Sequence, residues 1–302
     1  MSYQGSWSRR GEWLELIPGK VIRESDDRET ATMTWLLNVV GMPEKLLRRL
    51  KHEKGIQWNG DKLRLAIFPS RPIGINSIWQ ELKVLYEDDF CLVIHKPAGM
   101  MIHPDGRAGE VTLDHIVAAH FESMGDNVAV RHIHRLDQHT SGPVLYAKNE
   151  WAQLNLDEDM RAKQIERKYV AFVEGKVDSS LTVIDLPIGK DRHHAQRRRV
   201  SPTGQSAITH VRVEERYKGS SLIKLELDTG RTHQIRVHLS HLGHPLLGDT
   251  LYGGSSSHIR RQALHGEQLC FSHPFTGDFI EINDDWPKDM VDLRLLLRAE
   301  VK

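Results

Sequence analysis

The chain has 302 residues with 41 basic and 41 acidic side chains, so its formal net charge is zero. Apolar residues make up 39% and charged residues 27%, the composition of a soluble globular protein with room for one large domain or two smaller ones. Apolar runs are too short for a membrane span, and the first residues lack the apolar core of a signal peptide. Neither cysteine, Cys91 or Cys270, has a paired spacing, which excludes a disulfide framework and a cysteine-based zinc site. A reducing cytoplasm is the expected compartment.

The first part of the chain reads as a small domain of its own. Apolar residues between 33 and 50 recur at helical spacing, and a glycine and a proline divide them into two short helices. A pair of short strands is expected over 55–68, because Asn59 and Gly60 form a tight-turn signal. A proline-rich linker follows. The sequence therefore predicts two domains, 1–80 and 81–302.

The second domain is predicted to be rich in strands. Short strands are expected at 91–94, 143–148 and 168–174, and alternation over 223–227 is typical of a half-buried strand. From residue 235 the apolar spacing changes to that of a helix. Strands do not alternate regularly with long helices, so the prediction is an α+β fold and not a doubly wound parallel sheet.

Two segments of the chain are locally basic despite the zero net charge. Residues 45–54 read KLLRRLKHEK, and residues 190–199 read KDRHHAQRRR. Each segment alone is as compatible with a solvated surface as with phosphate contact. A net charge of zero by itself argues weakly against a nucleic-acid-binding protein.

The segment 134–142, HRLDQHTSG, has the strongest chemical content. It places an acid, a base, two hydroxyls and a glycine between two strand-like runs, where catalytic groups tend to lie. The plainer interpretation of Asp137 is a turn residue that caps a strand.

Two further segments contain candidate site residues. Arg231 lies where an alternating strand gives way to a helix, and a cation at a helix N-terminus requires an anionic partner. Its plainer interpretation is a surface ion pair of small energy. Tyr169 shares a strand face with Ala171 and Val173, so on its own it is interpreted as a core or half-buried tyrosine.

The chain contains eighteen histidines, which raises the possibility of a metal site. His238, His241 and His244 recur at every third residue, and His132 and His134 share a strand face. No HExxH motif or comparable histidine–carboxylate spacing accompanies them. We therefore expect no functional metal.

Taken together, these segments resemble the RluA family of pseudouridine synthases. Five blocks match its motifs in order over about residues 83–280: 84–99, HRLDQHTSG at 134–142, RKYVAFVEG at 167–175, TGRTHQIRVHLSHLGHPLLGDTLYG at 229–253, and 261–277. The first 80 residues are similar, more loosely, to the alpha-L type RNA-binding domain that precedes many such synthases.

The resemblance implies a mostly antiparallel mixed-sheet catalytic domain that isomerises uridine in RNA without cofactor or metal. It implies that Asp137 is the essential carboxylate, that Arg231 is its ion-pair partner and that Tyr169 stacks on the uracil near carbon 5. Arg135 would fill the space left by a flipped-out nucleotide. Further RNA contacts are expected from His134, Thr140, Lys168 and Gln234.

Several alternatives stay open at this point. A non-catalytic RNA-binding protein, such as a ribosome assembly factor, would keep the basic segments without needing Asp137. An RNA N-glycosidase would release uracil. Ribosomal RNA is the favoured substrate and transfer RNA the second, and the protein is expected to be a monomer. Because all catalytic motifs follow the linker, a chain lacking residues 1–80 is expected to stay soluble and active, with weaker RNA binding.

Overall fold

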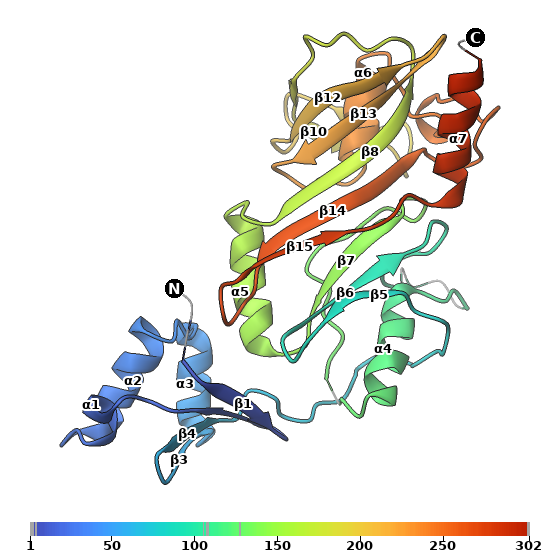
Figure 1. The fold of residues 1–302 in the computed structure, drawn as a ribbon. Helices are drawn as coiled ribbons and strands as arrows, with labels where there is room; N and C mark the ends of the chain where they lie inside the picture. The colour runs from blue at the N-terminus through green and yellow to red at the C-terminus, as the bar shows by residue number, and fades with distance from the viewer. Residues whose placement is uncertain (1–2, 4, 105, 107–108, 127, 301–302) are drawn as a thin grey trace.

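The N-terminal part of the chain forms a small α/β unit in the computed structural model (Figure 1). The structure describes residues 3, 5–104, 106, 109–126 and 128–300. The unit has a four-stranded antiparallel sheet in the order β1-β2-β4-β3. Its elements are β1 (Trp7–Arg10), β2 (Trp13–Leu16), α1 (Lys20–Arg23), α2 (Arg28–Asn38), α3 (Glu44–His52), β3 (Ile56–Asn59) and β4 (Lys62–Leu65).

Both predicted helices and the predicted hairpin are present in this unit. Asp27 accepts a hydrogen bond from the amide of Thr30 and so begins α2, and α3 buries its three leucines against the sheet side of the unit. Gly60 has a φ of +59°, which a glycine adopts without steric cost in the β3–β4 turn. The sequence did not predict the β1–β2 pair, because strands of four residues carry too short an alternating pattern.

The second part of the chain is built on two antiparallel sheets. A six-stranded sheet has the order β15-β14-β8-β13-β12-β9, and a three-stranded sheet has the order β5-β6-β7. All pairings between the named strands are antiparallel, so the predicted α+β class is confirmed. The elements are β5 (Val84–Glu87), β6 (Cys91–Lys96), α4 (Leu113–Ser123), β7 (Gly142–Ala147), α5 (Glu150–Arg161), β8 (Glu166–Glu174), β9 (Val183–Asp185), β10 (Ile188–Lys190), β11 (Arg198–Val200), β12 (Ile208–Arg216), β13 (Ser220–Leu227), α6 (Gln234–His241), the short 3-10 helix η1 (Thr250–Tyr252), β14 (Leu264–Ser272), β15 (Phe279–Asn283) and α7 (Lys288–Ala299).

The two sheets meet where β7 begins beside β14. Gly142 has a φ of +140°, and a Cβ atom there would lie 2.8 Å from the backbone of Gly266. The amide of Gly266 donates a hydrogen bond to the carbonyl of Ser141 at 2.8 Å. Only a glycine allows this approach, and the contact fixes the end of the 134–142 loop between the sheets.

The two parts of the chain share one hydrophobic core. Trp7 and Phe68 of the N-terminal part contact Phe90, with ring centroids 5.6 Å away in both pairs, and Phe90 stacks on Phe275 at 4.8 Å. The linker over 66–83 contains no helix or strand, and the predicted boundary near residue 80 falls within it.

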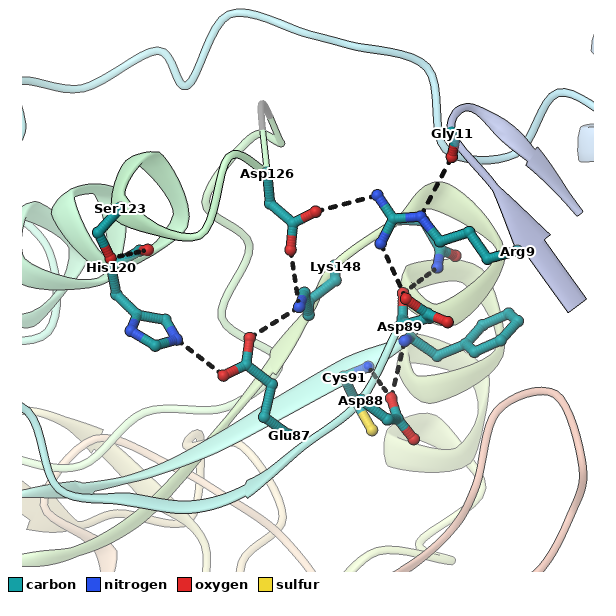
Figure 2. A network of polar contacts seen from close by, with 12 residues as sticks. Arg9, Gly11, Glu87, Asp88, Asp89, Cys91, His120, Ser123, Asp126 and Lys148 are labelled. Carbon is teal, nitrogen blue, oxygen red and sulfur yellow. Dashed lines mark hydrogen bonds and ion pairs between the residues drawn. The ribbon is translucent and has the colours of Figure 1, made fainter.

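An ion-pair network crosses the same junction (Figure 2). Arg9 of β1 lies 2.9 Å from both Asp89 and Asp126. Lys148 contacts Asp126 at 2.9 Å and Glu87 at 2.7 Å. Several of these groups are largely buried, so their ion pairs are directional. The network therefore fixes the orientation of the two parts, in addition to the apolar contact between them. Within the described residues, no helix has both the length and the apolar character needed to cross a bilayer.

Candidate active site

The 134–142 loop is held by three consecutive backbone carbonyls. The Asp137 carbonyl accepts from the amide of Thr140 at 3.0 Å. The Gln138 carbonyl accepts from Lys96 Nζ at 3.0 Å, and the His139 carbonyl accepts from Arg261 at 3.3 Å. The loop is therefore a rigid support for the Asp137 side chain and not a mobile surface turn.

Lys96 lies behind this loop without any exposed surface. Its ammonium also donates to the carbonyls of Pro97 and Met100. Burial lowers the pKa of Lys96 to about 7, against the opposing effect of the negative charge on Asp137. The three carbonyls use all three N–H donors of the ammonium, which places this lysine as a fixed support beneath the loop.

The Asp137 carboxylate forms an ion pair with Arg236, in the first turn of α6. Arg236 Nη1 donates to Asp137 Oδ2 at 3.2 Å, while its Nε and Nη2 donate to the two oxygens of Asp249 at 2.7 and 2.9 Å. Burial alone would lower the pKa of Arg236, but its hydrogen bond to Asp249 and the charge of Asp137 raise it above the ordinary value. Among the described residues, no side chain or amide is hydrogen-bonded to Asp137 Oδ1. One oxygen is thus fixed by the arginine and the other is available for chemistry.

This geometry corrects the predicted pairing of Asp137 with Arg231. The Arg231 side chain is exposed, and its Nε donates to the carbonyl of Ser206 at 3.0 Å. It precedes α6, whereas Arg236 lies on the helix, whose turn directs it toward the loop. Arg231, which was predicted from its place at the helix N-terminus, therefore lies on the rim of the site.

A cavity of about 630 Å³ opens beside Asp137. Tyr169 lines it from β8 and has 5% of its surface exposed. Among the described residues, its hydroxyl has no hydrogen-bond partner, so the group is available to a bound molecule. Burial raises the pKa of Tyr169, and the negative charge of Asp137 acts in the same direction. Arg231 and the exposed Arg135 line the same cavity.

Lys168 does not face this cavity. Successive side chains of a strand point to opposite faces, so Lys168 lies on the face of β8 opposite Tyr169. It lines a separate groove of about 660 Å³ and pairs with Glu166 at 3.2 Å. Lys168 therefore does not line the cavity beside Asp137, and its predicted contact with RNA stays a prediction.

Three other predicted RNA contacts line the cavity wall and form hydrogen bonds inside the protein, while Nδ1 of His134 is buried without a partner among the described residues. His134 Nε2 accepts from the amide of Leu145 at 3.2 Å, and Thr140 Oγ1 accepts from Gln262 at 3.0 Å. Gln234 donates to the carbonyl of Ile208 at 2.9 Å. All three side chains are buried and support the cavity wall, and their predicted contact with RNA stays a prediction.

Three side chains near Asp88 have the residue types and the spacing of a possible metal site. Potential ligand atoms of Asp88, Cys91 and His273 lie within 4.8 Å of one another. However, the Asp88 oxygens already accept from the amide of Cys91, the hydroxyl of Tyr86 and Nε2 of His273. These hydrogen bonds account for the grouping of the three side chains, which stabilises the β5–β6 turn.

Comparison with known proteins places the whole arrangement in one family. Residues 90–241 match the family described as RNA pseudouridylate synthase. YhcT of Bacillus subtilis, named an uncharacterized RNA pseudouridine synthase, is 45% identical over 238 residues, which cover 78% of this chain and 78% of that protein. This chain belongs to the RNA pseudouridine synthase family.

Other relatives agree with this assignment. The ribosomal large subunit pseudouridine synthase D of Vibrio cholerae is 38% identical over 235 residues, covering 73% of this chain and 72% of that protein. The structure titled human RNA pseudouridylate synthase domain containing 4 matches with a TM-score of 0.59 and 25% identity, covering 72% of this chain and 93% of that one. The predicted RluA-type family and the predicted enzyme class, an isomerase that acts on RNA, are confirmed.

Sequence reasoning missed two residues of the synthase's central ion-pair cluster. Arg236 and Asp249 both lie in the long segment 229–253 that carried the resemblance. The available signal was a second arginine and a single acid within this segment, because a charged group that becomes buried requires a partner. Nothing in their spacing of thirteen residues shows that the two groups meet.

Proposed function

We propose that this pseudouridine synthase modifies specific uridines of ribosomal RNA, with Asp137 as the group that reacts at the sugar. The observation that carries the proposal is the Asp137 carboxylate, which faces a cavity with one oxygen paired to Arg236 and the other without a hydrogen-bond partner in the part of the chain that the structure describes. An ionised carboxylate in this setting requires a compensating cation, and Arg236 supplies it.

The reaction separates uracil N1 from ribose C1′ and joins carbon 5 to the same carbon. Cleavage leaves the bonding electron pair on uracil and positive charge on the sugar, which a carboxylate can stabilise. Asp137 either forms a bond to C1′ or removes the 2′ proton, and the same Oδ1 atom serves both routes. No net oxidation or hydrolysis occurs, so the proposal includes no cofactor and no metal.

Tyr169 and Arg135 take roles on the base. A uridine stacked in RNA must leave its stack to reach Asp137. Tyr169, on the floor of the cavity, would stack on the flipped uracil with its hydroxyl toward carbon 5. Arg135, exposed at the cavity rim, has a planar guanidinium suited to occupying the vacated position.

The basic segment 190–199 supports an RNA path along the rim. It forms the β10–β11 hairpin, and Arg197 lies 5.3 Å from the ring of Tyr252, which Arg236 also contacts. In contrast, α3 of the N-terminal unit uses several cations in ion pairs with acidic neighbours. We therefore assign the first phosphate contacts to the hairpin and an accessory RNA role to residues 1–80.

Ribosomal RNA is proposed because relatives covering most of the chain are named ribosomal large subunit synthases. A cytoplasmic monomer fits this substrate. The test is to map pseudouridines in total RNA from a strain lacking the gene. Loss of a ribosomal site supports the proposal, and loss confined to transfer RNA overturns the substrate.

Purified protein tests the activity directly. Incubation with carbon-5-tritiated RNA should release tritium without free uracil. Release of uracil would identify a glycosidase, and RNA binding with neither product would identify the non-catalytic alternative.

A further inference from the structure

His233 lies beside Asp137 in an uncommon backbone conformation. It directly precedes α6 with a φ of +59°, a left-handed conformation that few residues other than glycine adopt. Its side chain is 17% exposed and lines the cavity, with Nε2 3.9 Å from Asp137 Oδ2. Backbone strain of this kind persists where the surroundings fix it, often at a functional site.

The hydrogen bonds around His233 determine which nitrogen carries the proton. The hydroxyl of Tyr252 accepts from the amide of Arg198 at 2.8 Å and lies 2.8 Å from His233 Nδ1. Among the described residues the hydroxyl has no other hydrogen-bond partner to receive its proton, so we assign Tyr252 as the donor to Nδ1, which places the imidazole proton on Nε2. Burial lowers the pKa of His233, and this effect outweighs the opposing charge of Asp137. The neutral form of the ring is therefore favoured near pH 7.

The Nε2–H group has no hydrogen-bond partner among the described residues. Its distance of 3.9 Å from Asp137 is too long for a hydrogen bond. The neighbouring guanidinium of Arg236 is already held by Asp249 and Asp137. Among the described residues, His233 and Arg236 are the basic side chains with a nitrogen within 4.0 Å of an Asp137 oxygen, and the facing donor of His233 is the unused one.

We propose that His233 donates its Nε2–H to a carbonyl oxygen of the flipped uracil and stabilises the uracil anion formed when the glycosidic bond breaks. The inference rests on the proposed function of Asp137. The bonding electrons of N1–C1′ move onto the uracil ring, and no proton is transferred by the histidine. Tyr252 is a positioning residue, because it acts by holding the tautomer.

The test compares uridine with 5-fluorouridine in the same RNA. Fluorine withdraws electrons and makes the departing base less basic, so a hydrogen bond to it contributes less. His233→Asn keeps a residue that tolerates the left-handed conformation but loses the reach of the imidazole. We expect a roughly hundredfold loss of single-turnover rate on uridine, the typical effect of removing one donor to developing charge, and a clearly smaller loss on 5-fluorouridine. Digestion and nucleoside chromatography measure the loss of each starting nucleoside, because carbon 5 of 5-fluorouridine carries no proton to release and so yields no pseudouridine.

Controls separate this role from a structural one. His241→Asn, at an exposed histidine of the same helix, should keep the wild-type rate. Tyr252→Phe keeps the aromatic ring but removes the hydroxyl that holds the proton of His233 on Nε2. Its single-turnover rate should fall less than that of His233→Asn, and the fall should again be larger on uridine than on 5-fluorouridine. Equal losses on both substrates, or a His233→Asn rate within a few-fold of wild type, would overturn the proposal. If the wild-type protein converts neither substrate, the proposed function itself has failed.

Discussion

At the residue scale, Asp137 combines a fixed and a free carboxylate oxygen. Asp137→Asn keeps the side-chain size and an oxygen that can accept from Arg236, so we expect a folded protein with an unchanged melting temperature. An amide can neither attack the sugar nor take a proton, so turnover should vanish. Tritium release beside a thermal melt measures both, and substantial activity in the folded variant would exclude the mechanism.

Arg236 is buried and Arg231 is exposed, so replacing each by alanine should have different effects on the free energy of unfolding and on turnover. Arg236→Ala leaves Asp249 buried without its cation, which should lower stability by about 3–5 kcal/mol. It should also remove turnover. Arg231→Ala, at an exposed position, should change stability by less than about 0.5 kcal/mol and act on RNA binding. Denaturant unfolding and single-turnover rates of the two variants provide the comparison, and the reverse order would contradict the assigned pairing.

His134 makes the folded state sensitive to acid. Burial lowers the pKa of His134 from 6.5 to about 3, so the folded protein holds the ring neutral while the unfolded chain binds a proton. Its contribution to stability is complete above pH 6.5 and is lost as the pH falls from 6.5 toward 3, at up to about 1.4 kcal/mol per pH unit.

A variant isolates this contribution from the carboxylates, which titrate in both proteins. His134→Gln keeps an acceptor for the amide of Leu145 but has no proton to bind. Unfolding free energies measured between pH 7 and pH 4 should fall more steeply for the wild type. Parallel curves would mean that His134 is not held neutral.

At the element scale, the extended segment over 131–133 connects the junction of the two parts to the active site. Arg131 has no side-chain partner among the described residues, and it lies beside Arg49 and Arg71, which share Glu150. Burial and the charge of Arg71 lower the pKa of Arg131. Six residues span at most about 20 Å, so this guanidinium lies within a few nucleotides of Asp137.

An unpaired cation in this place is expected to contact an RNA phosphate. Arg131→Gln should weaken RNA binding and reduce the slope of log affinity against log salt by about 0.7–0.9. The turnover rate at saturating RNA should stay the same. Lys218→Gln, which removes one charge in the exposed β12–β13 turn, is the matched control. Equal salt slopes for both variants would remove Arg131 from the RNA path.

At the scale of the whole molecule, the shared core changes the result expected from removing residues 1–80. Without Trp7 and Phe68, the rings of Phe90 and Phe275, which are 0% and 2% exposed, would face water. A chain of residues 81–302 should therefore melt at lower temperature or aggregate. This expectation replaces the soluble, active fragment predicted from the order of the motifs.

A cut in the linker provides the companion experiment. A protease site introduced between residues 69 and 80 leaves both parts of the core present. After cleavage the two pieces should elute together in gel filtration, because the Arg9 ion pairs and the aromatic contacts remain. Separation of the pieces, or a stable and active truncated chain, would show that the two parts fold independently.

Local sequence by itself predicted several of the elements and the reactive loop. The alternation around Tyr169, the helical spacing after residue 235 and the Asn59–Gly60 turn are properties of neighbouring residues, and the structure contains each of them. The residues of the 134–142 loop, and the order of this loop and the other motifs along the chain, were sufficient to predict the family and the enzyme class. These features depend on chemistry within a few residues.

Only the tertiary structure decided which distant groups meet. Arg231 and Arg236 lie five residues apart in one motif, and the turn of α6 alone selects Arg236 for Asp137. The contact of Asp249 with Arg236 and the shared core beneath Phe90 likewise join segments that carry no mutual pattern in the sequence. Contacts between distant residues depend on how the elements pack in three dimensions. The spacing of apolar residues along the chain contains no information about these contacts.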